Sequence, residues 1–279
     1  MFEQTPEAPS IPELERIARE VRKDIVRMTN AAGSGHPGGS LSSTDILTAL
    51  YFGLLRHDPA NPRWDGRDIF ILSKGHAAPA LYSILAAAGY FPKNELITLR
   101  KIGSRLQGHA HTGVPGVEVS TGSLGQGLSI ACGIALASRL DGSRRRIVAL
   151  LSDGENDEGQ TWEAAMFASH RRLDNITVFV DRNGIQNDGF TKDILDTTPL
   201  DEKWKAFGWN VISINGHDFS QIIDAYRKGL QCRGAPTAII AKTVKGKGVS
   251  FMENNVAFHG KAPNGEELAR ALRELDGVK

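Results

Sequence analysis

The sequence predicts an α/β fold in which a parallel sheet carries helices on both faces. Short apolar runs of strand length alternate along the chain with longer stretches whose apolar residues recur with the 3.6-residue period of a helix. The apolar runs are nearly continuous, as expected for parallel strands that are buried on both faces. Polar, glycine-rich segments follow several of these runs, so we expect one α/β domain whose functional groups gather at the carboxyl ends of the strands.

The chain begins with a predicted helical segment over residues 10–60. Ser10 and Glu13 have the spacing of a capping box, and the apolar residues behind them keep a helical period over the following turns. Residues 33–39 are rich in glycine and proline and therefore predict a loop. A second helix is predicted at about residues 44–55.

The middle of the chain alternates between strands and helices, and its end forms a loop and one more helix. The predicted strands are Ile69–Leu72, Ile147–Leu151, Ile176–Val180, Val211–Ile214 and Thr237–Ala241. The predicted helices are His76–Ala88, Gln126–Leu140, Gln160–Arg172, Leu200–Phe207 and Phe219–Leu230. Residues 242–279 predict a loop rich in glycine and lysine, followed by a helix that Asn264 and Glu267 cap.

Composition excludes several classes of protein. Lys and Arg number 33 against 32 Asp and Glu, so the net charge of +1 offers no basic field to attract nucleic acid. No apolar run approaches the roughly 20 residues of a membrane-spanning helix, and the first residues lack the apolar core of a secretory leader. Two cysteines provide no disulfide framework. We therefore expect a cytoplasmic protein that binds neither nucleic acid nor membrane.

Two segments match known binding motifs only superficially. Residues 33–38 satisfy the G-x-G-x-x-G dinucleotide pattern, but a predicted helix rather than a strand precedes them. His109 and His111 lack further ligands at the spacing of a zinc site. The sequence also has no P-loop motif. These segments therefore indicate neither a nicotinamide cofactor nor a zinc ion.

Asp153 and Asn183 follow successive predicted strands and lie 30 residues apart. A βα unit returns the chain to the same edge of a sheet in about 30 residues, so the two side chains can meet. A carboxylate, an amide oxygen and a nearby carbonyl form a sparse oxygen shell that suits Mg²⁺ or Ca²⁺ holding a diphosphate. Backbone N–H groups around Gly154 favour the same anion. The residues alone leave a second interpretation open, because Asp-Gly and Asn-Gly are also common turn dipeptides.

The wider set of motifs resembles transketolase. Asp153-Gly154 followed by Asn183 is similar to the thiamine diphosphate motif, in which GDG is followed one βα unit later by an asparagine. The other matching segments follow in the family's order: residues 35–38 (GHPG), 73–76 (SKGH), 108–109 (GH), 121–127 (TGSLGQG) and 259–263 (HGKAP). The resemblance covers the family's diphosphate-binding domain, which residues 1–279 would form as a single unit. The resemblance implies that the pyrimidine-binding and C-terminal domains would lie on another polypeptide, as in the N-terminal subunit of a split, two-gene transketolase.

The resemblance implies a role for each matching residue. Asp153, Asn183 and the carbonyl of Ile185 would ligate Mg²⁺ or Ca²⁺. The residues that would contact thiamine diphosphate are His76, His109, Gly122, Ser123, Leu124, Gly154, Glu155, Asn183 and His259. The residues that would handle protons or contact the donor ketose are His36, His76, His109 and His259. Glu158 would help to link two cofactor sites across a dimer interface.

The sequence departs from the usual family pattern at three places. Ser152 replaces the first glycine of GDG, Ala110-His111 replaces a Pro-Glu pair, and Asn187 replaces an aliphatic residue. The small Ser152 is expected to be harmless. The other changes leave open the substrate preference and the details of the cofactor pocket.

Several remaining residues are interpreted without a function. The histidines expected to be solvated or to cap turns are His57, His111, His170 and His217. Lys242, Lys245 and Lys247 are expected to lie in a solvated, mobile loop. Cys132 is expected to pack within an apolar helix.

The resemblance implies an activity that is shared between two polypeptides. This chain would move a two-carbon ketol unit from a ketose phosphate to an aldose phosphate. A C-terminal subunit would supply the pyrimidine-binding domain in an α₂β₂ assembly. One alternative is another two-component thiamine enzyme, of the 2-oxo acid dehydrogenase or deoxyxylulose-phosphate synthase type. His36, His259 and His109 argue against it, because they resemble ketose-handling positions. A subunit that holds the cofactor without catalysis is the other alternative.

Overall fold

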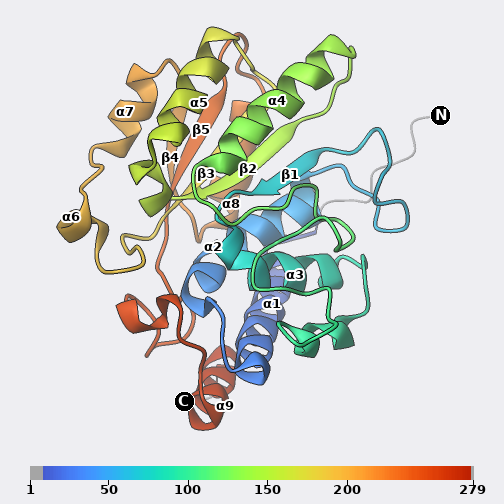
Figure 1. The fold of residues 1–279 in the computed structure, drawn as a ribbon, viewed down its shortest axis with the longest axis vertical. Helices are drawn as coiled ribbons and strands as arrows, with labels where there is room; N and C mark the ends of the chain where they lie inside the picture. Colours follow the sequence, from blue (N-terminus) through green and yellow to red (C-terminus); the bar gives the residue numbers. More distant parts are fainter. Residues whose placement is uncertain (1–8, 278–279) are drawn as a thin grey trace.

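The computed structural model describes residues 9–277 and confirms the predicted α/β architecture (Figure 1). The sheet is parallel and five-stranded, with the order β1-β2-β3-β5-β4. Its strands are β1 (Ile69–Leu72), β2 (Ile147–Ser152), β3 (Ile176–Arg182), β4 (Asn210–Asn215) and β5 (Thr237–Lys242). Each predicted strand is present. Residues 1–8, which bear on the expectation that the chain has no leader, lie outside the described residues.

Helices cover both faces of the sheet, as predicted (Figure 1). The helices are α1 (Ile11–Ala32), α2 (Pro37–Ala49), α3 (Ala78–Ala87), α4 (Gln126–Leu140), α5 (Gly159–His170), α6 (Thr191–Ile194), α7 (Leu200–Ala206), α8 (Phe219–Gly229) and α9 (Gly265–Leu275). Helices α4, α5 and α7 pack on one face, while α8 and the N-terminal group α1–α3 pack on the other. Within residues 9–277, every helix is too short or too polar to cross a bilayer.

Successive residues of each strand point to opposite faces of the sheet. In β2, Val148 and Leu150 join the core beneath α1–α3 and α8, whereas Ile147, Ala149 and Leu151 join the core beneath α4, α5 and α7. Both sets are fully buried. This two-sided burial is the reason that β1, β2, β3 and β5 appear in the sequence as continuous apolar runs, whereas the edge strand β4 is only partly buried.

The N-terminal helices differ from the prediction. Helix α2 begins at Pro37, inside the predicted glycine-proline loop, because proline fits the first helical position, where its missing N–H is not needed. It continues into a π-helical turn over Leu50–Leu54. The predicted capping box at the start of α1 is wrong, since the Ser10 side chain makes no capping hydrogen bond. The box formed by Asn264 and Glu267 at the start of α9 is confirmed.

The register of the sheet brings three loops together at its carboxyl edge. Ser152 at the end of β2 pairs with Asp181 of β3, and Arg182 of β3 pairs with Lys242 at the end of β5. The segments that follow these strands therefore leave the sheet side by side. Because β5 lies between β3 and β4, the loop after β5 meets the loop after β3, although the two are distant in the sequence.

Candidate active site

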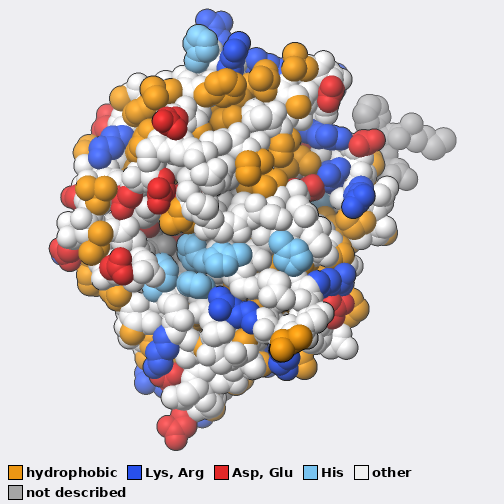
Figure 2. Space-filling model, viewed as in Figure 1, with side chains coloured by type: hydrophobic (Ala, Val, Ile, Leu, Met, Phe, Trp, Pro, Cys, Tyr) orange, Lys and Arg blue, Asp and Glu red, His pale blue; other side chains and the backbone are white. Residues whose placement is uncertain are grey.

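Four histidines from separate segments meet at the carboxyl edge of the sheet. His36 precedes α2, His76 lies in a short helical turn after β1, His109 lies in the loop before α4, and His259 lies between β5 and α9. The His36 ring centroid is 5.2 Å from that of His76, 5.6 Å from that of His259 and 6.2 Å from that of His109. Histidine side chains accordingly gather near the centre of the face shown in Figure 2. The structure thus brings together all four histidines that the motifs identified.

Burial lowers the pKa of each of these imidazoles. The pKa of His36 falls to about 4, mainly through burial and then through the charge of Arg100. The pKa of His259 falls to about 3, through burial and then the charge of Lys245, and burial also lowers those of His76 and His109. Each ring is therefore neutral at pH 7 and carries one N–H donor and one acceptor nitrogen.

One of these rings has a buried nitrogen without a partner. Within residues 9–277, His36 Nδ1 is buried and makes no hydrogen bond. Buried polar atoms are nearly always hydrogen-bonded in native proteins. The unpaired nitrogen lies in the histidine cluster, which indicates that a polar ligand completes its hydrogen bonding there.

The loops that carry Asp153 and Asn183 also meet, at a position beside the histidines. The Asp153 carboxylate accepts hydrogen bonds from the N–H of Gly154 at 3.0 Å and from the N–H of Gly184 at 2.6 Å. Asn183 Oδ1 accepts one from the N–H of Ile185 at 3.1 Å. The pKa of Asp153 is raised to about 6, mainly by burial and then by the charge of the nearby Asp181. A carboxylate in this position is stabilised by a cation placed beside it.

The chemistry of this corner fits a hard divalent cation. Asp153, Asn183 and Ile185 offer a carboxylate, an amide oxygen and a carbonyl oxygen. The Lys245 ammonium donates to the Ile185 carbonyl at 2.8 Å, and its charge lowers the pKa of Asp153. A positive charge thus already lies among these oxygens. Within the described residues no three His, Cys, Asp or Glu side chains group as metal ligands, so a bound Mg²⁺ or Ca²⁺ would draw its remaining ligands from phosphate and water.

Lys245 is a site residue that the sequence interpretation assigned wrongly. It is buried rather than solvated, and its Nζ lies 2.7 Å from Nδ1 of His259. Burial lowers its pKa to about 8. Lys242 is exposed, as predicted, but it is the last residue of β5 rather than part of the loop. The position of Lys245 just after a strand could have indicated a site residue. That position points to the Asn183 loop only once β5 is known to lie beside β3.

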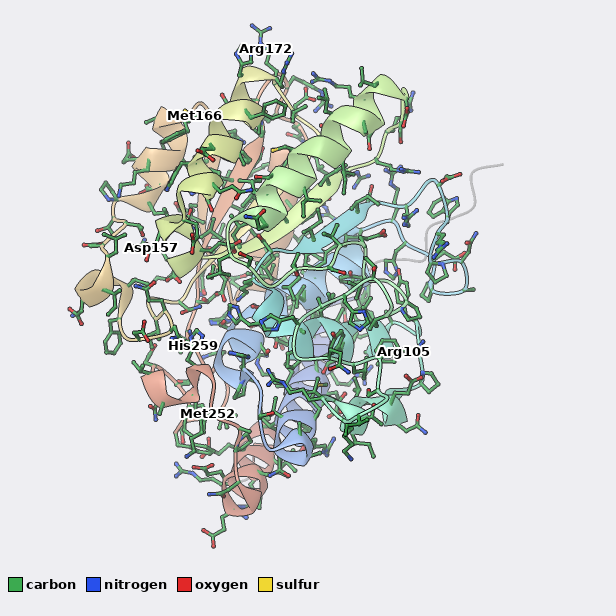
Figure 3. All side chains as sticks on the ribbon, in the orientation of Figure 1. Arg105, Asp157, Met166, Arg172, Met252 and His259 are labelled. Carbon is green, nitrogen blue, oxygen red and sulfur yellow. The ribbon has the colours of Figure 1, made fainter. Side chains whose placement is uncertain are left out.

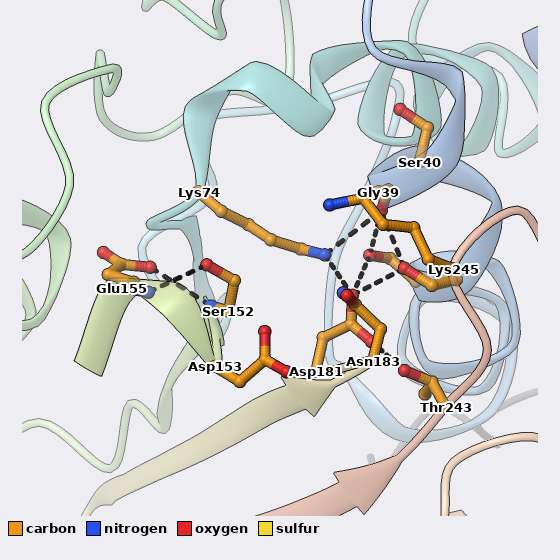
Figure 4. A network of polar contacts seen from close by, with 12 residues as sticks. Gly39, Ser40, Lys74, Ser152, Asp153, Glu155, Asp181, Asn183, Thr243 and Lys245 are labelled. Carbon is orange, nitrogen blue, oxygen red and sulfur yellow. Dashed lines mark hydrogen bonds and ion pairs between the residues drawn. The ribbon is translucent and has the colours of Figure 1, made fainter. Parts of the chain in front are cut away.

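A buried ion pair between Lys74 and Asp181 lies next to Asn183 (Figure 4). Asp181 also accepts hydrogen bonds from the hydroxyls of Ser42, at 2.6 Å, and Thr243, and from Asn183 Nδ2 at 3.1 Å. Burial opposes ionisation of Asp181, but the charge of Lys74 keeps its pKa low. Because Asp181 takes the Asn183 amide N–H, it fixes which way that amide faces and leaves its oxygen on the other side.

The Glu155 side chain connects neighbouring loops through hydrogen bonds. Its carboxylate accepts hydrogen bonds from the Ser73 hydroxyl, from the N–H of Gly125 at 2.9 Å and from the N–H of Ser152 at 3.3 Å. It therefore joins the segments that follow β1 and β2 to the start of α4. Because both of its carboxylate oxygens accept these hydrogen bonds, Glu155 would contact a cofactor through its backbone.

The remaining motif residues lie around the histidines and at the start of α5. Gly122 lies beside the His109 ring, and a Cβ at Gly122 would be in van der Waals contact with the ring at 3.4 Å. Ser123 and Leu124 continue from it toward the start of α4. Glu158 is exposed at the N-terminus of α5.

Two of the histidines expected to be solvated or to cap turns make tertiary contacts instead. His57 stacks on the Tyr90 ring with centroids 5.7 Å apart. His217 is held between Asp45 and the backbone N–H of Val244. Both make specific contacts, so the expectation is wrong for them. The prediction that Cys132 packs in an apolar helix is confirmed, and burial raises its pKa to about 12.

Known proteins are similar to this sequence over nearly its whole length. The sequence profile described as "Transketolase, thiamine diphosphate binding domain" matches residues 14–279. The 6-deoxy-6-sulfo-D-fructose transketolase subunit SqwG of Clostridium sp. (strain MSTE9) is 45% identical over 265 residues, covering 95% of this chain and 96% of that protein. An apulose-4-phosphate transketolase subunit from Actinobacillus succinogenes is 45% identical over 268 residues, covering 95% of this chain and 97% of that protein.

Solved structures share the fold. The crystal structure of transketolase from Campylobacter jejuni superposes with a TM-score of 0.91 at 34% identity, covering 97% of this chain and 44% of that one. This chain therefore spans less than half the length of that transketolase. The matched profile and the similarity to transketolase subunits show that the chain belongs to the transketolase family, of which it is a thiamine-diphosphate-binding domain.

Proposed function

We propose that this chain is the thiamine-diphosphate- and metal-binding subunit of a two-subunit transketolase, which moves a two-carbon ketol unit from a ketose phosphate to an aldose phosphate. The observation that carries the proposal is the junction of the Asp153 and Asn183 loops beside four neutral histidines. Relatives named as transketolase subunits match over nearly their whole length, which supports an activity divided between two polypeptides.

Each group of residues in the site would have a distinct task. Asp153, Asn183 Oδ1 and the Ile185 carbonyl would hold Mg²⁺ or Ca²⁺ against the diphosphate. When bound, thiamine diphosphate supplies a nucleophilic carbon and an electron sink for the ketol unit. The neutral N–H groups of His76 and His109 would donate to the diphosphate or to a developing oxyanion.

His36 and His259 would handle the protons of the donor sugar. Their rings meet edge to face with centroids 5.6 Å apart. A neutral imidazole can accept a proton from a hydroxyl at one nitrogen and donate at the other. Because Nδ1 of His259 already faces the Lys245 ammonium, His259 would donate from Nε2. The unpaired Nδ1 of His36 would be the atom that accepts from the substrate.

Exposed apolar side chains support assembly with a partner. Ile130 of α4 and Met166 and Phe167 of α5 are 36%, 54% and 38% exposed. Apolar side chains gather over these helices in Figure 2, and Met166 is labelled on α5 in Figure 3. Exposed apolar patches commonly mark protein interfaces. In the α₂β₂ assembly that we propose, a C-terminal subunit with the pyrimidine-binding domain covers this surface, and Glu158 lies at its edge.

A reconstitution experiment tests the proposal. The chain is mixed with a polypeptide that carries the pyrimidine-binding domain, and calorimetry follows the binding of thiamine diphosphate with Mg²⁺. Ketol transfer is then measured over a panel of ketose donors, because the two named relatives differ in their ketose. We expect transfer only with both polypeptides present.

Each other outcome supports a different conclusion. Robust turnover by this chain alone would contradict a division of the activity. Cofactor binding without transfer for any donor would favour a subunit that only holds the cofactor. Turnover of 2-oxo acids in place of ketoses would favour the other class of two-component thiamine enzyme.

A further inference from the structure

A buried cluster of three ionisable side chains lies outside the motifs. Arg22 of α1 donates from Nη1 and Nη2 to the Asp45 carboxylate of α2 at 2.9 and 2.6 Å. His217, in the turn between β4 and α8, places Nδ1 2.7 Å from the same carboxylate. The three side chains are 10%, 6% and 12% exposed in this order. The cluster therefore joins three separate elements through one buried carboxylate.

The cluster also binds the backbone on both sides of Lys245. The N–H of Val244 donates to His217 Nε2 at 2.9 Å. Arg22 Nε donates to the Lys247 carbonyl at 3.2 Å. Between these two contacts, the Lys245 side chain turns into the candidate active site.

These contacts determine where the His217 proton lies. The backbone N–H of Val244 can only donate, so Nε2 accepts and the ring proton is on Nδ1, from which it is donated to Asp45. Both ring nitrogens are engaged. The Asp45–His217 pair therefore has no free nitrogen for general-base catalysis and is suited instead to hold the loop.

We propose that Arg22, Asp45 and His217 are positioning residues for Lys245. They hold the backbone at residues 244 and 247 so that the ammonium reaches the Ile185 carbonyl and His259. The proposal rests on the proposed function in so far as Lys245 belongs to the cofactor site. The Gly246 N–H also bonds to the Gly38 carbonyl, so loss of one His217 contact is expected to shift the segment without releasing it.

Two substitutions of His217 separate its two hydrogen bonds. In His217→Gln the carboxamide oxygen can take the place of Nε2 and accept from Val244. In His217→Asn the side chain reaches only the place of Nδ1, so it can donate to Asp45 but leaves the Val244 N–H without its acceptor. Both variants carry a neutral carboxamide, and each is therefore a matched control for the other.

The first measurement needs no cofactor. Acetylation of Lys245 by an amine-reactive reagent is followed by mass spectrometry in the full-length chain. We expect His217→Asn to raise the rate severalfold and His217→Gln to leave it close to that of the wild type. Arg22→Lys keeps a positive charge beside Asp45 but loses the Nε bond to Lys247, and is expected to give the same increase. It keeps the test available if His217→Asn does not fold.

The second measurement is calorimetry with thiamine diphosphate and Mg²⁺ on the assembled complex. We expect affinity to fall about tenfold in His217→Asn, as for the loss of one buried hydrogen bond, and to change less than about threefold in His217→Gln. In a Lys245→Met background, His217→Asn is expected to cause no further loss, because residues that act through one another are not additive.

Three results would overturn the proposal. One is additive losses of affinity in the double variant. The second is an unchanged acetylation rate in both His217→Asn and Arg22→Lys. The third is an equal loss of thermal stability in both His217 variants with no difference in Lys245 acetylation, which would make the cluster merely structural. If the wild-type complex binds no thiamine diphosphate, the proposed function fails, whereas the acetylation experiment still decides the positioning role.

Discussion

Single residues determine the charge state of the candidate active site. The four histidines are kept neutral by burial, while a lysine and a raised-pKa carboxyl lie beside them. Groups with such perturbed pKa values concentrate at functional sites, because catalytic acids and bases need pKa values that differ from those they have in water. The same perturbations can be measured as effects of pH and of charge removal.

The lowered pKa values of His36 and His259 predict a loss of stability in acid. Their values of about 4 and about 3 lie below the ordinary 6.5. Between pH 6.5 and about 4 the unfolded chain binds protons that the native chain does not, so the free energy of unfolding falls as pH falls through this window. The His259→Asn substitution removes the contribution of His259 to this pH dependence. We expect urea unfolding at pH 7 and pH 5 to show a smaller loss of stability in the variant.

The comparison with wild type is needed because other groups titrate nearby. The raised pKa of Asp153 acts in the opposite direction over the same range, but it is common to both proteins and cancels in the difference. Equal losses of stability in wild type and variant would show that His259 is not held neutral by the fold.

Removal of the Asp153 charge is expected to abolish tight cofactor binding. Asp153→Asn keeps the size of the side chain but removes the charge that attracts the divalent ion. The affinity for thiamine diphosphate with Mg²⁺ is expected to fall by on the order of 100-fold, since even changes next to metal ligands cost 10–100-fold. Calorimetry on the assembled complex measures this. Asp188→Asn, an exposed change in the loop after β3, is the control. Undiminished binding in Asp153→Asn would refute the metal site.

At the scale of elements, the first turn of α4 approaches the end of β1 very closely. A Cβ at Gly127 would lie 2.6 Å from Ser73 Cβ and 2.8 Å from Ser73 Cα. Ser73 belongs to the segment that carries Lys74 and His76. The packing of a helix against a strand end therefore helps to place two residues of the site.

Two glycines of α4 give a matched test of this packing. Gly127→Ala is expected to lower the free energy of unfolding by about 1–3 kcal/mol, as overpacked substitutions do. Gly133 has no neighbouring atom within 4 Å of the corresponding position. Gly133→Ala is therefore expected to raise stability by about 0.5–1 kcal/mol through helix propensity. Denaturant unfolding measures both, and a change of the same sign in the two variants would contradict the close approach.

At the scale of the whole molecule, the apolar surface over α4 and α5 predicts association. Met166→Glu changes an exposed residue, so the stability of the isolated chain is expected to stay within about 0.5 kcal/mol. Association with the partner subunit is expected to weaken by about tenfold or more, as for a central interface residue. Ile97→Glu is the control, because Ile97 is also 54% exposed but lies on the short helix Lys93–Thr98. Sedimentation of the mixed subunits measures the association of both variants with the partner. Equal weakening in Met166→Glu and Ile97→Glu would remove the argument for this surface.

Local patterns in the sequence were sufficient for the sheet and for the main corner of the site. The strands β1, β2, β3 and β5 are buried on both faces and are continuous apolar runs, so each could be recognised within its own few residues. Asp153 and Asn183 could be paired because one βα unit separates them. A crossover of this kind returns the chain to the same edge of the sheet. The start of α2 at Pro37 was missed because the glycine and proline content of residues 33–39 predicts a loop, and tertiary packing outweighs such a weak local preference.

Only the tertiary structure decided the parts of the site that join distant segments. The order β3-β5-β4 places the loop after β5 beside Asn183, and this placement turns Lys245 from an expected surface lysine into a buried one. Likewise, Asp45 and His217 meet only because α2 packs near the turn before α8. The sequence by itself determined which groups stand at strand ends, since that follows from local periodicity. Which of those ends become neighbours depends on strand order, and therefore on the packing of the whole chain.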